Sequence, residues 1–158
     1  VFQNNPDLYF ESLSEGIWIP ILPIDCIDYD IMVGSDEIAQ GNWENVFAYD
    51  GFNLDVEDGE IWIGSIGSFA NFKVGEFKKA ASDRLSYQTL DGETLNKGFR
   101  ITLEKGKYRV SISGHKQHTN NDKTIYGYGF DFQKTAEFKG YNDPREDEKY
   151  TLNLPIYP

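Results

Sequence analysis

Apolar and polar residues alternate over two neighbouring stretches near the middle of the chain. Every second residue is apolar from Phe99 to Leu103 and again from Tyr108 to Ile112, with Gly106 between the two runs. Two such runs joined by a short glycine-containing loop predict an antiparallel hairpin over residues 99–113. An isolated hairpin is marginally stable in water, so further strands must cover its apolar face. We therefore expect the fold to be organised around this hairpin.

The same period of two recurs elsewhere. Residues 52–66 predict a second hairpin that turns at Asp58-Gly59 and has an acidic outer row. In residues 124–132 the aromatic side chains share one face and Gly127 and Gly129 the other, which predicts a bend or the close approach of another backbone. Pro20 and Pro23 make residues 17–24 an edge strand or an extended cover. Further strands are expected over 43–50, 67–77, 85–90 and 150–156, a loop or short helix over 36–42 and 78–84, and exposed loops over 114–123 and 139–149.

About eight to ten strands with little helix predict an all-β fold, either an antiparallel β-sandwich or a small barrel, and we favour the sandwich. The 158 residues suit a single domain over 1–158. The 11 Phe, 10 Tyr and 3 Trp agree with a β-rich core. Residues 1–16 are expected to form an N-terminal arm, in which Leu8, Tyr9, Phe10 and Leu13 dock a short helical turn.

Charge is distributed unevenly. The net charge is −11, and the first basic residue is Lys73. An acidic block of this length repels nucleic-acid phosphates and anionic lipid, and it attracts cations or a basic protein surface. Simple solubility explains the acidity equally well, although 72 positions without a basic residue favour a partner surface.

Composition also bears on the compartment. A single cysteine, Cys26, excludes an intrachain disulfide and fits a reducing compartment. Its acidic neighbours disfavour a thiolate, so a buried apolar role is expected for it. Residues 1–20 lack the features of a signal peptide, and no apolar run reaches the roughly 20 residues that span a bilayer. We expect a cytoplasmic protein, although a chain that begins at Val1 leaves open whether a leader was removed.

Candidate chemistry is sparse. His115 and His118 lie three residues apart, near Asp122, in the expected loop over 114–123, but a metal site needs further fixed ligands. The acids between Asp50 and Asp58 do not have EF-hand spacing and also read as the solvent row of a strand. No nucleophile or phosphate-binding loop accompanies the histidines. No metal or cofactor is therefore predicted, and a non-enzymatic role is expected.

Three segments resemble the competence-associated nuclease inhibitor family and related bacterial toxin-immunity proteins. Trp43 is followed by GFNLDVEDGEIWIG over residues 51–64, LEKGKYRV occupies residues 103–110, and YTLNLP occupies residues 150–155. The resemblance covers Gly41–Ser113 and the tail from Tyr150. It implies a protein that presents carboxylates to the basic cleft of a nuclease.

Charge and resemblance together predict an acidic protein that neutralises a basic partner, most plausibly a bacterial toxin or nuclease, and binds neither nucleic acid nor membrane. The oligomeric state is not predicted. One alternative is a carbohydrate- or calcium-binding module that uses Trp62 and the acids over 50–58, and another is a hydrolase that uses His115 and His118. The expected partner surface comprises Asp28, Tyr29, Asp30, Asp36, Glu37, Trp43, Glu44, Asp55, Glu57 and Asp58.

Overall fold

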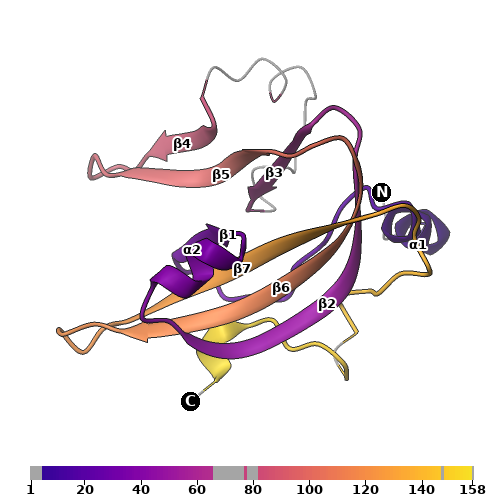
Figure 1. The fold of residues 1–158 in the computed structure, drawn as a ribbon. Coiled ribbons are helices and arrows are strands. Elements are labelled where there is room, and N and C mark those ends of the chain that lie inside the picture. Colours follow the sequence, from indigo (N-terminus) through magenta and orange to yellow (C-terminus); the bar gives the residue numbers. More distant parts are fainter. Residues whose placement is uncertain (1–4, 66–76, 78–81, 147, 158) are drawn as a thin grey trace. The chain divides into compact units, whose positions relative to one another are not determined.

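The computed structural model describes residues 5–65, 77, 82–146 and 148–157, which belong to two compact units (Figure 1). The larger unit comprises Val1–Asp55 and Gly106–Pro158, and the smaller one comprises Val56–Lys105. Each unit contains one β-sheet. The predicted all-β class is confirmed, and the described strands form two sheets.

The sheet of the larger unit has four strands in the order β1-β7-β6-β2, so β1 and β2 are its edges (Figure 1). β6 and β7 are antiparallel, and Val110 lies opposite Phe132. β1 runs parallel to β7, with Asp30 opposite Gly127. The strands are β1 (Tyr29–Val33), β2 (Glu44–Val56), β6 (Gly106–His118) and β7 (Thr124–Thr135).

Helix α1 (Pro6–Ser14) begins with residues that favour a helix N-terminus, and its buried apolar side chains anchor it to the larger unit. The Asn5 side chain accepts a hydrogen bond from the amide of Leu8, and Pro6 occupies the first turn, where its missing N–H costs nothing. Tyr9 and Leu13 are 2% and 3% exposed. The predicted docking of a helical turn is therefore confirmed.

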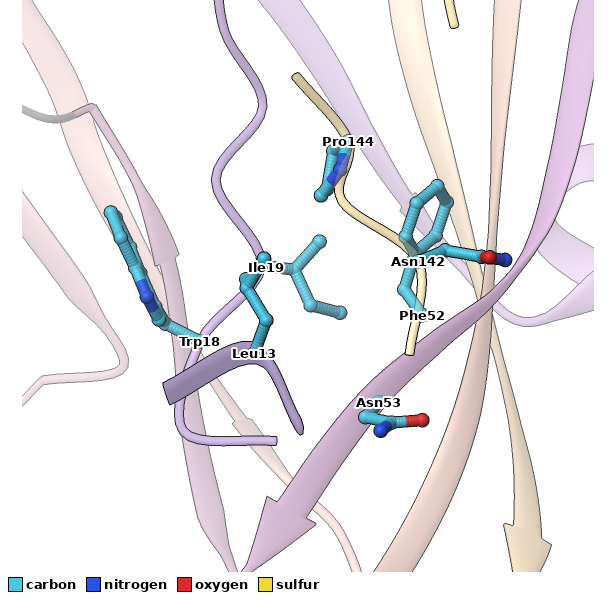
Figure 2. Close-up of a pocket in the computed structure, with 7 residues that line it drawn as sticks. All are labelled: Leu13, Trp18, Ile19, Phe52, Asn53, Asn142 and Pro144. Carbon is cyan, nitrogen blue, oxygen red and sulfur yellow. The ribbon is translucent and has the colours of Figure 1, made fainter. Parts of the chain in front are cut away.

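The core of the larger unit lies on one face of its sheet. Val110 and Ile112 of β6 are fully buried there, and Leu154 of the C-terminal segment is equally inaccessible. That segment was expected to be a strand, but it is extended and ends in the short 3₁₀ helix η2 (Leu154–Ile156). Figure 2 shows a neighbouring part of this core, where the side chains pack closely and leave a cavity volume of about 0 Å³. The side chains that meet there are Leu13, Trp18, Ile19, Phe52, Asn53, Asn142 and Pro144.

The smaller unit holds a three-stranded antiparallel sheet in the order β3-β5-β4. Ile61 of β3 lies opposite Ile101 of β5, which gives one face an apolar row. On the other face Arg100 forms an ion pair with Asp83, with 2.7 Å between Nη2 and Oδ1. The strands are β3 (Glu60–Gly64), β4 (Arg84–Gln88) and β5 (Thr94–Thr102).

Both predicted hairpins are wrong in their pairing, although their strands exist. β5 and β6 belong to different sheets, and so do β2 and β3. The two turns predicted at Gly106 and at Asp58-Gly59 are instead links from one sheet to the other. The links lie together, because the amide of Leu103 donates a 3.0 Å hydrogen bond to the carbonyl of Gly59. Alternation of apolar and polar residues predicts a strand with one buried face, but it does not reveal which strand pairs with it.

Several local expectations need correction. β6 continues to His118, so residues 114–118 are strand and not loop. Residues 17–24 form no strand, which leaves their role as an extended segment. Cys26 is exposed and not buried. The strand expected over 67–77 lies outside the described residues, apart from the buried Phe77.

The short segment expected over 36–42 is indeed partly helical, since helix α2 (Ser35–Gln40) follows β1. α2 packs against β1 and β7. Across the described ranges, every helix is too short or too polar to cross a membrane.

Candidate partner-binding surface

Three carboxylates are spread along β1 and the start of α2. Asp28 precedes β1, Asp30 lies on it, and Asp36 lies in the first turn of α2. All three are exposed, and none forms an ion pair with another described residue. Because no cation among the described residues neutralises them, their charges act on whatever approaches β1.

Glu37 belongs to the same region but already has a partner. Its Oε2 accepts a 2.7 Å hydrogen bond from the backbone amide of Val33, at the end of β1. This bond satisfies a backbone donor of the edge strand and holds α2 beside it. The carboxylate remains exposed and still contributes negative charge to the surface.

Trp43 lies against the glycine face of β7. A Cβ atom added to Gly127 would lie 3.4 Å from Cη2 of Trp43 and 2.9 Å from Cε of Met32. The predicted close approach of another backbone is confirmed at Gly127, where the carbonyl of Asp30 is one neighbour, and the other two are side-chain groups, an indole and a thioether. This contact places the half-buried Trp43 next to Asp30, the register partner of Gly127.

The His115 ring lies next to the Trp43 ring, with 6.5 Å between the two ring centroids. It is 3% exposed, and its Nε2 lies 2.8 Å from Oγ of Ser113. Its Nδ1 is buried without a hydrogen-bond partner among the described residues. Burial lowers the pKa of His115, because removing the ring from water penalises its charged form.

The Tyr29 side chain lies on the face of β1 opposite to that of Asp30. Its ring centroid lies 4.9 Å from that of Tyr128, and its hydroxyl donates a 3.0 Å hydrogen bond to the carbonyl of Asp25. Burial raises the pKa of Tyr29. Its ring is half-buried and already packed, so it supports β1 more than it offers a free aromatic anchor.

The remaining predicted residues are not part of this cluster. Glu44 is exposed but lies 3.5 Å from Nζ of the buried Lys116. Asp55 is paired with Lys107 at 3.1 Å and lies eleven residues further along β2, roughly 36 Å at about 3.3 Å per residue. Glu57 and Asp58 are exposed residues of the smaller unit.

We define the acidic surface as the six predicted residues that lie on or next to β1, α2 and the start of β2. Two contribute rings and four contribute carboxylates, all within the segment that runs from before β1 to the start of β2. Its members are Asp28, Tyr29, Asp30, Asp36, Glu37 and Trp43.

The two histidines do not form a site together. On a strand, side chains three positions apart point to opposite faces, so His115 and His118 diverge. His118 lies at the exposed end of β6, where its Nδ1 is 3.0 Å from Oγ1 of Thr124. Among the residues with described positions, no three histidine, cysteine or acidic side chains form a metal-binding group.

Two of the residues suggested for calcium or carbohydrate binding, Asn53 and Trp62, are engaged in structural contacts. Asn53 is 3% exposed and donates to the carbonyl oxygens of Ser14 and Gly140. Trp62 packs edge-on against Phe77 at 5.3 Å between centroids, and the Arg100 guanidinium lies 5.8 Å from its ring. Neither residue presents a free ligand-binding group.

An open hollow of about 500 Å³ lies at the other edge of the sheet, beside β2. Its one cation, Lys149, donates to Oδ1 of Asn142 at 3.2 Å and sits 4.9 Å from the ring of Tyr150. These contacts fix the lysine to the protein itself.

The sequence did not predict that His115 is buried next to Trp43, because its position suggested an exposed loop. A longer period-two pattern through Gly114 and Lys116 was the available signal.

Comparison with protein-family models, with curated proteins and with solved structures finds no match to this chain.

Proposed function

We propose that the protein is a non-enzymatic binding protein whose acidic surface neutralises a basic protein partner. The observation that carries the proposal is the group of exposed carboxylates of Asp28, Asp30 and Asp36, which have no ion-pair partner in the described structure. Asp30 is the one of them that lies next to Trp43, across Gly127. Exposed charge of one sign accelerates encounter with a surface of opposite sign. A partly buried aromatic residue at the same place supplies the apolar contact that charge alone lacks.

The partner class that fits best is a basic toxin or nuclease of bacterial origin. A nuclease cleft holds phosphates with lysine and arginine side chains, and carboxylates on a strand and a short helix can occupy the same positions. The resemblance of residues 41–113 and of the tail to nuclease inhibitors and toxin-immunity proteins supports the same class. Binding of this kind blocks the cleft and needs no catalytic group.

The test uses the whole chain as bait in extract of the source cell. We expect a basic protein to be retained at about 0.1 M salt and released at about 1 M, where the Debye length falls from about 10 Å to about 3 Å. Trp43→Ala should weaken retention about tenfold, as the loss of a binding anchor does. Leu90→Ala is the matched control, because Leu90 is an exposed apolar residue of the smaller unit.

Circular dichroism and urea unfolding establish that both variants remain folded. Retention only of acidic or neutral proteins, or of a basic protein that remains bound at high salt, would contradict the proposed function.

A further inference from the structure

β1 is an edge strand whose outer side is only partly occupied. It pairs with β7 on one side and lies at the end of the strand order. Edge strands present unpaired N–H and C=O groups that can accept another strand. Natural proteins usually cover or charge such edges. The groups that cover part of the β1 edge therefore define which of its backbone groups remain available for binding.

Two hydrogen bonds show which backbone groups point outward. The amide of Gly34 donates to the carbonyl of Phe130 on β7 at 2.8 Å, whereas the amide of Val33 donates away from β7 to the Glu37 carboxylate at 2.7 Å. Direction alternates along a strand. The amides and carbonyls of Tyr29 and Ile31 therefore point away from β7, in the same direction as the Val33 amide.

Glu37 covers only the last of these outward amides. In the described structure no hydrogen bond joins the backbone of Tyr29 or Ile31 to a residue on the outer side. The free edge is thus short, from Tyr29 to Ile31, and it ends at α2. A segment that pairs here gains two or three backbone hydrogen bonds.

The side chains along this edge divide by face. Asp30 is exposed on the face that also carries Met32, and the exposed Asp28 immediately precedes the strand. Tyr29 and Ile31 are half-buried on the opposite face. Neighbouring strands place their side chains about 4.5–5.5 Å apart on each face, so opposite charges favour pairing and like charges oppose it.

We propose that the free edge of β1 binds the basic partner by strand addition. The partner supplies an extended segment that alternates basic and apolar residues, with its lysines or arginines beside Asp28 and Asp30 and its apolar side chains beside Tyr29 and Ile31. This inference rests on the proposed function and specifies how the acidic surface recognises its partner. A second copy of the chain is disfavoured as the added strand, because it would bring Asp28 and Asp30 against the same carboxylates.

The test uses a synthetic peptide of about six residues that alternates lysine and valine, titrated against the whole chain at low salt. Two further peptides carry N-methyl groups, one on every lysine amide and one on every valine amide. All three have the same charge, but each methylated peptide has lost the N–H donors along one edge. Only one edge of the peptide can face β1.

We expect methylation of one set alone to weaken binding about tenfold, through the loss of backbone hydrogen bonds, and methylation of the other set to leave the affinity unchanged. The sensitive set is the valines for antiparallel pairing and the lysines for parallel pairing. Hydrogen exchange at the Ile31 amide should slow when the unmethylated peptide binds. Equal affinity of the three peptides, or no binding at all, would overturn strand addition.

The two proposals fail differently. The variant Asp28→Asn/Asp30→Asn/Asp36→Asn should weaken binding of every peptide. If it does so while methylation has no effect, the acidic surface binds by charge alone, and strand addition is wrong. Association of the protein with itself through β1, detected by sedimentation together with Ile31 protection in the absence of peptide, would also overturn this inference.

Discussion

At the scale of single residues, three glycines show how closely other groups approach the sheets. A Cβ at Gly114 would lie 2.3 Å from the Phe47 ring, and one at Gly127 would lie 3.2 Å from the carbonyl oxygen of Asp30. At Gly98 of the smaller unit the nearest atom would be 3.5 Å away, which is an ordinary contact.

Alanine substitution should therefore destabilise in the order Gly114, Gly127, Gly98. We expect several kcal/mol for Gly114→Ala, about 1–3 kcal/mol for Gly127→Ala and little change for Gly98→Ala, because overpacking costs energy only where neighbours cannot move. Urea unfolding measures the three free energies. A Gly127→Ala protein as stable as the Gly98→Ala protein would contradict the packing of Met32 and Trp43 over β7.

His115 makes stability depend on pH. Its pKa in the folded protein lies below the ordinary value of 6.5, because burial disfavours the imidazolium. Above about pH 6.5 the ring is neutral in both states and contributes nothing. Below that pH the unfolded chain binds the proton first, so stability falls as the pH decreases to the folded pKa, by at most about 1.4 kcal/mol per pH unit.

The measurement is the free energy of unfolding between about pH 5 and pH 8 for the wild type and for His115→Gln. The difference between the two curves should change below about pH 6.5. His118→Gln, at the exposed end of β6, is the control and should follow the wild type. Parallel curves for the wild type and His115→Gln would contradict the burial of this ring.

At the scale of elements, the sequence predicted strands better than their neighbours. The alternation in β5, β6 and β7 is clear because each strand has an apolar face, and the corresponding strands are present. Pairing was mispredicted at both links because Gly59 and Gly106 suit a tight turn and a link between sheets equally well. Both have positive φ angles, 87° and 138°, which glycine adopts readily in either setting.

The acids were harder to place than the strands. The row of Asn53, Asp55 and Glu57 was expected to face solvent, and Glu57 is exposed. Asn53 is instead buried, because the end of α1 and the backbone of Gly140 lie against it. Segments distant in sequence therefore decide which side chains of this row are exposed.

Asn53 joins three elements and should be essential to the larger unit. It donates to the carbonyl of Ser14 at the end of α1 and to that of Gly140, and it accepts a hydrogen bond from the Arg109 guanidinium. Asn53→Ala removes all three hydrogen bonds in a buried position, so we expect a loss of about 2–3 kcal/mol in urea unfolding. Asn121→Ala, at an exposed turn, is the control, and an equally small effect of both substitutions would show that Asn53 does not hold α1 in place.

At the scale of the whole molecule, the charge pattern of the sequence predicted the kind of surface but not its extent. Residues 1–72 lack basic side chains, yet Asp55, Glu44 and Glu60 find cations in Lys107, Lys116 and Arg100 from later in the chain. Pairing between residues so distant in sequence depends on topology, which composition does not reveal. The carboxylates of Asp28, Asp30 and Asp36 are among those that form no ion pair with a described residue, and the proposed function depends on them.

The most direct test of that claim is the equilibrium capture of the basic partner by two variants with the same net charge. One is Asp28→Asn/Asp30→Asn/Asp36→Asn, and the other, Asp7→Asn/Glu137→Gln/Glu146→Gln, removes three exposed carboxylates elsewhere in the larger unit. We predict that the first variant loses the salt-sensitive partner and that the second retains it as the wild type does. Equal retention by both variants, or equal loss from both, would contradict an acidic surface centred on β1.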